Sequence, residues 1–245
     1  PLAAMNDGPL KCVDPTTRTI GSAGDEKSDP DNTLVFILSD HGENLGDHGH
    51  AGHFFNLYDS NLRIPLLARG PGFPPGSVEK TLVQIGDIYT TVLGSAGITP
   101  PDHSSGVDLR QPLPQHRVLE ASLAYPKISL DVFRRIRSSK QLERYEVALN
   151  AAVGPRYKLI QSRTIEGTLV REEIFDILED PNEQQPLSAN AVDPSALAAL
   201  RAVVGEGGTT QHGHANTLDD IDPESRKALQ ALGYLSTDDP PERED

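Results

Sequence analysis

Tryptophan is absent from this sequence, and its 245 residues include a single cysteine, Cys12. One cysteine forms no internal disulfide, so cysteine content does not indicate a redox compartment. Aromatic residues make up only 5% of the chain, which argues against stacking platforms for bases or sugars. Positive charge is also scarce, because 22 Lys and Arg face 36 Asp and Glu and leave a formal net charge of −14. Nucleic-acid surfaces need a basic face, so we predict no nucleic-acid partner.

Long apolar runs are missing as well. None approaches the roughly 20 residues that a membrane-spanning helix needs, so we expect no membrane segment in this chain. The sequence starts at Pro1, and its one methionine is the internal Met5. We therefore expect the chain to be a fragment, and its localisation cannot be predicted from a leader sequence.

What the sequence does contain is a short apolar run at residues 33–38 that ends in Ser39-Asp40-His41-Gly42. Runs of this kind are typical of a parallel strand that is buried on both faces. Open α/β sheets bind ligands outside the carboxyl ends of their strands, so we expect function directly after residue 38.

Periodicity and turn residues predict the remaining elements. We expect strands at residues 64–68, 117–122, 145–149, 157–160 and 173–177, the last three in a small antiparallel sheet. We expect helices at residues 87–96, 194–204 and 223–232, with N-caps at Asp87, Asp193 and Asp222 respectively. The resulting division is an irregular or disordered segment at 1–30, an α/β part at 31–140, a subdomain at 141–237 and an acidic tail at 238–245.

Metal-ligand side chains cluster behind the first strand. Carboxylates and imidazoles held at a strand end are what a divalent cation needs. Adjacent Asp40 and His41 would face opposite sides of a strand, so we expect the chain to bend there, with Gly42 supplying the freedom. For His48 and His50 we favour solvent-exposed loop histidines. The cluster consists of Asp40, His41, Glu43, Asp47, His48, His50 and His53.

The stretch from Asp31 to Gly49, with Ser-Asp-His-Gly-Glu at its centre, resembles the central signature of the sulfatase family in the alkaline phosphatase superfamily. The similarity continues in family order through Gly52-His53, Arg63-Ile64-Pro65, Asp87–Leu93, Tyr157–Ile160 and Ile174–Glu183. This resemblance implies an alkaline-phosphatase-like α/β fold. The chain would hold part of a mixed, mostly parallel sheet flanked by helices, followed by a small C-terminal antiparallel sheet with helices.

The resemblance also implies site residues. Asp40 and His41 match a pair of the family's metal ligands, with Ca²⁺ the expected ion and Mg²⁺, Mn²⁺ and Zn²⁺ as alternatives. His53 falls where members carry a Lys or His that contacts the sulfate or assists the leaving oxygen, so we expect it to be catalytic. Glu43 is expected to orient the loop or a ligand rather than to bind metal.

The family's nucleophile is a formylglycine made from a Cys/Ser-x-Pro-x-Arg motif, and this motif is missing from the sequence. Around Cys12 the proline and arginine come too late, so we interpret Cys12 as a bystander. We expect formylglycine and the remaining metal ligands on an absent N-terminal half, which this chain would need as a partner. The parent enzyme would be a sulfuric ester hydrolase, and the isolated chain is expected to be inactive.

Two alternatives remain open. The chain could derive from a phosphate or phosphonate ester hydrolase or a phosphoethanolamine-type transferase of the same superfamily. It could also be a catalytically dead metal-binding or interaction module. The expected substrate is a sulfated small molecule or glycan, or else a phosphate ester. The resemblance implies a periplasmic or secreted protein.

Overall fold

The computed structural model describes residues 32–102, 104–126, 129–130, 133–134 and 142–205, together with Glu224 and Lys227. The expectations for residues 1–30 and 238–245 lie outside this part of the chain. So does the predicted helix at 223–232, apart from those two residues, which are helical.

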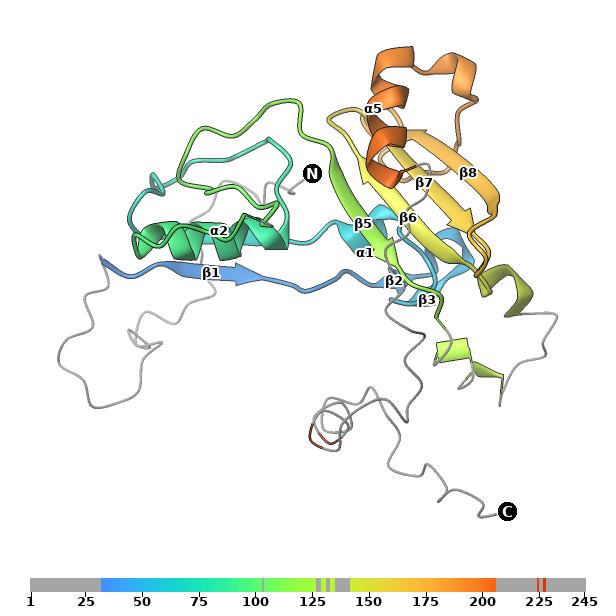
Figure 1. Cartoon of the computed structure of the whole chain (residues 1–245), viewed down its shortest axis with the longest axis horizontal. Coiled ribbons are helices and arrows are strands. Elements are labelled where there is room, and N and C mark those ends of the chain that lie inside the picture. The colour runs from blue at the N-terminus through green and yellow to red at the C-terminus, as the bar shows by residue number, and fades with distance from the viewer. Residues whose placement is uncertain are drawn as a thin grey trace.

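The first part of the fold is built on short strands (Figure 1). Strand β1 (Val35–Leu38) pairs antiparallel with β4 (Leu66–Arg69), and β2 (Asn44–Leu45) pairs antiparallel with β3 (Ala51–Gly52). The predicted parallel sheet is not confirmed, because every strand pair in the described residues is antiparallel. Nor is β1 buried on both faces, since Ile37 is 44% exposed. An apolar run indicates that a strand can be buried, but it does not indicate whether the neighbouring strand is parallel or antiparallel.

The small C-terminal antiparallel sheet is confirmed. Its strands follow chain order as β5 (Leu119–Leu123), β6 (Ala148–Val153), β7 (Tyr157–Arg163) and β8 (Leu169–Asp176). Neighbouring strands are antiparallel throughout, with one register irregularity near Arg163. Strand β5 comes from the stretch assigned to the α/β part, so this sheet draws on both sides of the expected boundary at residue 140.

Alternation along the strands gives this sheet two buried faces. Ala152, Leu159 and Ile174 face helix α5 (Pro194–Val204), whose Leu197, Leu200 and Val204 complete one core cluster. Their chain neighbours Ala151, Ile160 and Phe175 point the other way and pack against Leu57, Tyr58 and Leu82. The sheet therefore lies between α5 and the segment that follows the predicted metal ligands, and it anchors that segment.

The helices begin where polar side chains satisfy free backbone groups. Asp193 caps α5 as predicted, accepting a hydrogen bond from the Ala196 amide. Helix α2 (Ile85–Ser95) is capped by Gln84, so Asp87 is not the N-cap that we predicted. Asp87 instead sits at the third helical position, where its carboxylate accepts from the Gln84 amide and completes a capping box. The prediction was wrong because the Asp87 side chain accepts its capping hydrogen bond from a position inside the helix and not from the residue before it.

Shorter helical turns complete the fold. They are α1 (Asp59–Leu62) and the 3-10 turns η2 (Asp47–Gly49), η3 (Glu143–Tyr145) and η4 (Ala189–Ala191). Among the described residues, no helix combines the length and the apolar character that crossing a membrane requires.

Candidate metal centre

The chain turns sharply where β1 ends. The Ser39 hydroxyl donates to the His41 carbonyl at 2.6 Å, and the Asp40 carboxylate accepts from the His41 amide at 3.0 Å. These bonds fold Ser39, Asp40 and His41 into a tight corner. The Asp40 side chain is 77% exposed at that corner, so the carboxylate is available to a ligand.

Gly42 is required for a close approach rather than for the backbone freedom that we predicted. Its amide donates to the Asn61 carbonyl at 2.8 Å, and it is not among the residues with a positive φ. A Cβ at this position would overlap the Ser60 carbonyl oxygen. The backbone of α1 thus packs directly against the turn that carries Asp40 and His41.

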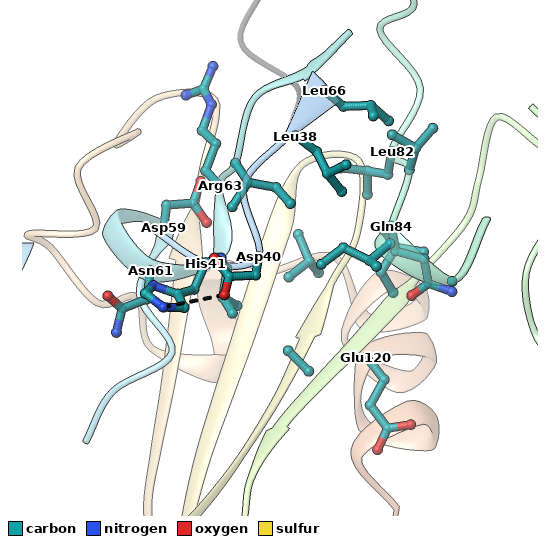
Figure 2. Close-up of a pocket in the computed structure, with 18 of the residues that line it drawn as sticks. Leu38, Asp40, His41, Asp59, Asn61, Arg63, Leu66, Leu82, Gln84 and Glu120 are labelled. Atoms are coloured by element: carbon teal, nitrogen blue, oxygen red, sulfur yellow. Dashed lines mark hydrogen bonds and ion pairs between the residues drawn. The ribbon is translucent and has the colours of Figure 1, made fainter. Parts of the chain in front are cut away.

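Asp40 and His41 are brought together as predicted. His41 Nδ1 lies 2.7 Å from the Gly42 carbonyl oxygen. Since a carbonyl only accepts, this bond places a proton on Nδ1 and leaves the lone pair on Nε2. Nε2 lies 3.8 Å from Asp40 Oδ2, the pair joined by the dashed line in Figure 2. A metal-binding histidine commonly donates a hydrogen bond from its second ring nitrogen to a carbonyl in this way. Asp40 and His41 therefore fit a cation held between one oxygen and one nitrogen.

His53 lies directly against this pair. Its ring stacks on His41 with centroids 4.1 Å apart and an interplanar angle of 29°. Its Nδ1 is 3.2 Å from Glu43 Oε2, while its Nε2 is buried and has no hydrogen-bond partner. Glu43 therefore contacts His53. Ligand atoms of His41, Glu43 and His53 all lie within 4.8 Å of one another.

A buried network of side-chain amides supports these residues, and we predicted no role for it. The Asn44 amide donates to Asn61 Oδ1 at 2.8 Å, and the Ser60 hydroxyl donates to Asn44 Oδ1 at 2.6 Å. The Asn61 amide in turn donates to the His53 carbonyl at 3.3 Å. Asn44 and Asn61 are almost fully buried, so each amide holds a separate stretch of the turn in place. Asn44 lies between Gly42 and Gly46, which could have marked it as a turn residue, but no such signal accompanies Asn61.

A buried ion-pair triad anchors α1 to the C-terminal sheet. Lys158 on β7 is fully buried, and its Nζ lies 2.8 Å from Asp59 Oδ1 and 2.6 Å from Glu183 Oε1. Glu183 Oε2 also accepts from the Asp59 amide. Burial raises the pKa of Glu183 and nearby Asp59 adds to the rise, while Lys158 opposes it. The sequence predicted Lys158 only as part of a strand, because burial of a lysine depends on partners that are distant in the chain.

Of the candidate ligands, His48 and His50 do not join the cluster. His48 stacks on Tyr58 at 3.6 Å, and His50 packs against Tyr58 and Tyr145. Burial, followed by the charge of Arg144, lowers the pKa of His50. Burial beside Glu173 raises the pKa of Tyr58 to about 12. Both histidines are partly buried among aromatic rings, so the expectation of exposed loop histidines was wrong in that detail. They still stand apart from the metal ligands.

A pocket of about 360 Å³ opens beside Asp40 and His41. Figure 2 shows the two side chains at one end of it and Leu38, Leu66 and Leu82 along its wall. The lining is mainly apolar, with a few polar groups such as Gln84 and Glu120. Chemically, the site offers a carboxylate and an imidazole for a cation, a second imidazole beside them, and an apolar wall.

Comparison with known proteins bears on this site. A family model described as sulfatase matches residues 7–98 of the chain. A delta 4,5-hexuronate-2-O-sulfatase from Bacteroides thetaiotaomicron is 28% identical over 87% of this chain and 42% of its own length. The human N-acetylgalactosamine-6-sulfatase is 28% identical over 71% of this chain and 37% of its own length. The chain thus spans less than half of each relative. These matches confirm the predicted resemblance to the sulfatase family.

Solved structures agree on the fold. The structure of a 2-O GAG sulfatase superposes with a TM-score of 0.50 at 24% identity, covering 70% of this chain and 35% of that one. The structure of a protein in complex with its substrate D-glucosamine-2-N,6-O-disulfate gives a TM-score of 0.53 at 23% identity. It covers 69% of this chain and 33% of the other.

Proposed function

We propose, starting from the relationship of this chain to the sulfatase family, that it forms part of a metal-dependent hydrolase of sulfate esters. The observation that carries this proposal is the Asp40–His41 pair. It lies at the end of β1, with Oδ2 and Nε2 3.8 Å apart and the Nε2 lone pair left free by the Gly42 carbonyl. The two side chains would hold one side of a divalent cation.

Ca²⁺ is the ion that we propose for this pair. It takes six to eight ligands, mostly oxygens, so two side chains fit only part of its shell. The other ligands would come from substrate, water and residues outside this chain. Bound there, the cation would draw negative charge from the sulfate oxygens. Mg²⁺, Mn²⁺ and Zn²⁺ remain alternatives for the same pair.

His53 is the catalytic residue that we assign to the leaving group. Glu43 accepts a hydrogen bond from a protonated Nδ1, which leaves Nε2 as the ring nitrogen without a partner. Protonated at Nε2, the ring would stabilise the oxygen that departs from sulfur, or donate a proton to it. Burial of Nε2 strengthens this interaction because little water competes for it.

The substrate that we propose is a sulfated small molecule or glycan. Support comes from the relatives, one of which is named for a hexuronate 2-O-sulfate and one for an N-acetylgalactosamine 6-sulfate. The apolar pocket wall beside Asp40 could accept the carbon face of such a group. A phosphate ester is the alternative, and direct comparison of the two ester types distinguishes them.

The nucleophile is supplied from elsewhere in our proposal, because no Cys/Ser-x-Pro-x-Arg motif occurs in the sequence. Exposed apolar side chains on β1 and α2 support a need for further chain, since a larger fold would cover them. They include Ile37 at 44%, Val92 at 45% and Tyr89 at 53% exposed. The isolated chain should therefore be inactive.

Hydrolysis assays test this function. We expect the 245-residue chain alone to release no phenol from an aryl sulfate. The protein encoded by the whole reading frame should cleave aryl sulfate in preference to aryl phosphate. Asp40→Asn should lower that rate by at least about 10-fold, the loss typical of weakened metal sites. Preference for the phosphate, or an unchanged rate in Asp40→Asn, would overturn the proposal.

A further inference from the structure

We propose that His41, Glu43 and His53 form a binding site for a borderline transition-metal cation such as Zn²⁺. This site differs in donor set from the Asp40–His41 pair. Its ligand atoms come from three side chains and all lie within 4.8 Å of one another. It includes Glu43 and His53 as ligands and does not require Asp40.

The spacing of these atoms is close to that of a zinc shell. Zinc binds imidazole nitrogen and carboxylate oxygen at about 2.0–2.2 Å in a tetrahedron, so two ligand atoms lie roughly 3.3–3.5 Å apart. Glu43 Oε2 and His53 Nδ1 are 3.2 Å apart, so a cation that replaces the shared proton needs little movement. The ligand atom of His41 lies within 4.8 Å of the ligand atoms of Glu43 and His53. It therefore has to approach them by about 1.5 Å at most to reach the spacing of a zinc shell.

Rotation of the His41 ring can supply this movement. Its side chain is 36% exposed, and its Nδ1 bond to the Gly42 carbonyl already leaves the Nε2 lone pair available. Glu43 is 48% exposed, so the carboxylate edge of the cluster is open to solvent. The two rings are neighbours before any metal binds, and because a cation lies in the plane of each imidazole that binds it, the His41 ring has to tilt out of its stack on His53.

The donor chemistry selects the cation. Two imidazoles and one carboxylate suit Zn²⁺, Co²⁺, Ni²⁺ or Cu²⁺, whereas Ca²⁺ requires a shell rich in oxygen. Three protein ligands leave a fourth position for water. The site shares His41 with the proposed calcium pair, and it takes up a ring nitrogen of His53. Zinc at these residues would therefore oppose the proposed catalytic use of His53.

Calorimetric titration of the metal-free 245-residue chain with Zn²⁺ tests this site. Visible absorption of Co²⁺ in the same protein reports the coordination geometry. His53→Gln and Glu43→Gln should each weaken Zn²⁺ binding by at least about 10-fold and lower the intensity of the tetrahedral Co²⁺ bands. Far-ultraviolet circular dichroism of each variant confirms that the sheet is retained.

Two control variants sharpen the result. His116→Gln changes an exposed histidine outside the cluster and should leave Zn²⁺ binding unchanged. Asp40→Asn should also leave Zn²⁺ binding within about 2-fold, while it removes the response to Ca²⁺ that the proposed function requires. The proposal is overturned if His53→Gln and Glu43→Gln bind Zn²⁺ as tightly as the wild type. It is also overturned if Asp40→Asn weakens Zn²⁺ binding as much as they do.

Discussion

The Nζ of Lys158 lies 2.8 Å from Oδ1 of Asp59, which joins the middle of the C-terminal sheet to the first residue of α1. The lysine is fully buried, and Glu183 completes its ion pairing at 2.6 Å. Since the Gly42 amide bonds to Asn61 in α1, this triad sets the position of the turn that carries Asp40 and His41. The geometry of the site therefore depends on a sheet that contributes no ligand to it.

We predict that Lys158→Met lowers the free energy of unfolding by about 3–5 kcal/mol, because the buried carboxylate of Glu183 and the partly buried carboxylate of Asp59 lose their counter-charge. Equilibrium denaturation in urea measures the loss. Lys80→Met is the matched control, since Lys80 is exposed, and it should change stability by less than about 0.5 kcal/mol. Equal effects of the two substitutions would show that the triad does not anchor α1.

Gly42→Ala should destabilise the turn after β1. The added methyl overlaps the Ser60 carbonyl, so α1 must move away, at a cost of about 1–3 kcal/mol. We expect a lower melting temperature together with weaker cation binding at Asp40. Gly86→Ala is the control, because the nearest atom to a Cβ there is the side-chain Nε2 of Gln84, at 3.8 Å. A Gly42→Ala protein with unchanged stability and binding would contradict the close packing of the turn on α1.

The cap of α5 offers a local test. Asp193 accepts from the Ala196 amide at 2.9 Å, and Asp193→Ala should cost about 0.5–2 kcal/mol of unfolding free energy. Ser188→Ala is the comparison, since Ser188 precedes η4 without a side-chain capping bond. It should have almost no effect in the same denaturation assay. A similar loss in both variants would mean that the α5 cap contributes nothing specific.

Part of this fold could be predicted from the chain alone because its determinants are local. The Asp193-Pro194 start of α5 and the short strands predicted at 157–160 and 173–177 depend on neighbouring residues, and the structure bears them out as α5, β7 and β8. The direction of the strand beside β1 could not be predicted in this way. It depends on pairing between residues some thirty positions apart, such as Phe36 with Ala68.

The same distinction applies to the site. Residue types marked a cluster of candidate ligands after the first strand, the resemblance to the sulfatase family singled out Asp40, His41 and His53 from it, and the structure places these three together. The residues that hold them in place could not be predicted, because Asn61 and Lys158 act through partners that only folding brings close. The predicted role of Gly42 was wrong for the same reason. Its need for a small side chain comes from Ser60, across the turn.

The Glu172–Arg201 pair, which joins β8 to α5, predicts a pH dependence. The hydrogen bond from Arg201 lowers the pKa of Glu172 below its ordinary 4.5. The folded protein thus favours the ionised form, and this stability is present above pH 4.5 and lost as the pH falls through the folded pKa. Glu172→Gln should cost about 0.2–1 kcal/mol at pH 7 and progressively less below pH 4.5.

Denaturation curves collected across this pH range measure the difference between wild type and Glu172→Gln. In an Arg201→Met background the same substitution should produce a smaller pH-dependent difference, since the largest cause is gone while the Gln161 hydrogen bond and the charge of Arg163 remain. An undiminished difference without Arg201 would show that Arg201 is not the main cause of the lowered Glu172 pKa.

A Ca²⁺ titration followed by amide NMR tests whether Asp40 and His41 hold a divalent cation. Two ligands bind Ca²⁺ weakly, so we expect shifts that saturate only at millimolar concentrations, a range of about 10⁻⁴–10⁻³ M or above. We predict that these shifts centre on residues 39–43 and on His53, and that Asp40→Asn abolishes them. Shifts centred elsewhere, or equal shifts in Asp40→Asn, would contradict it.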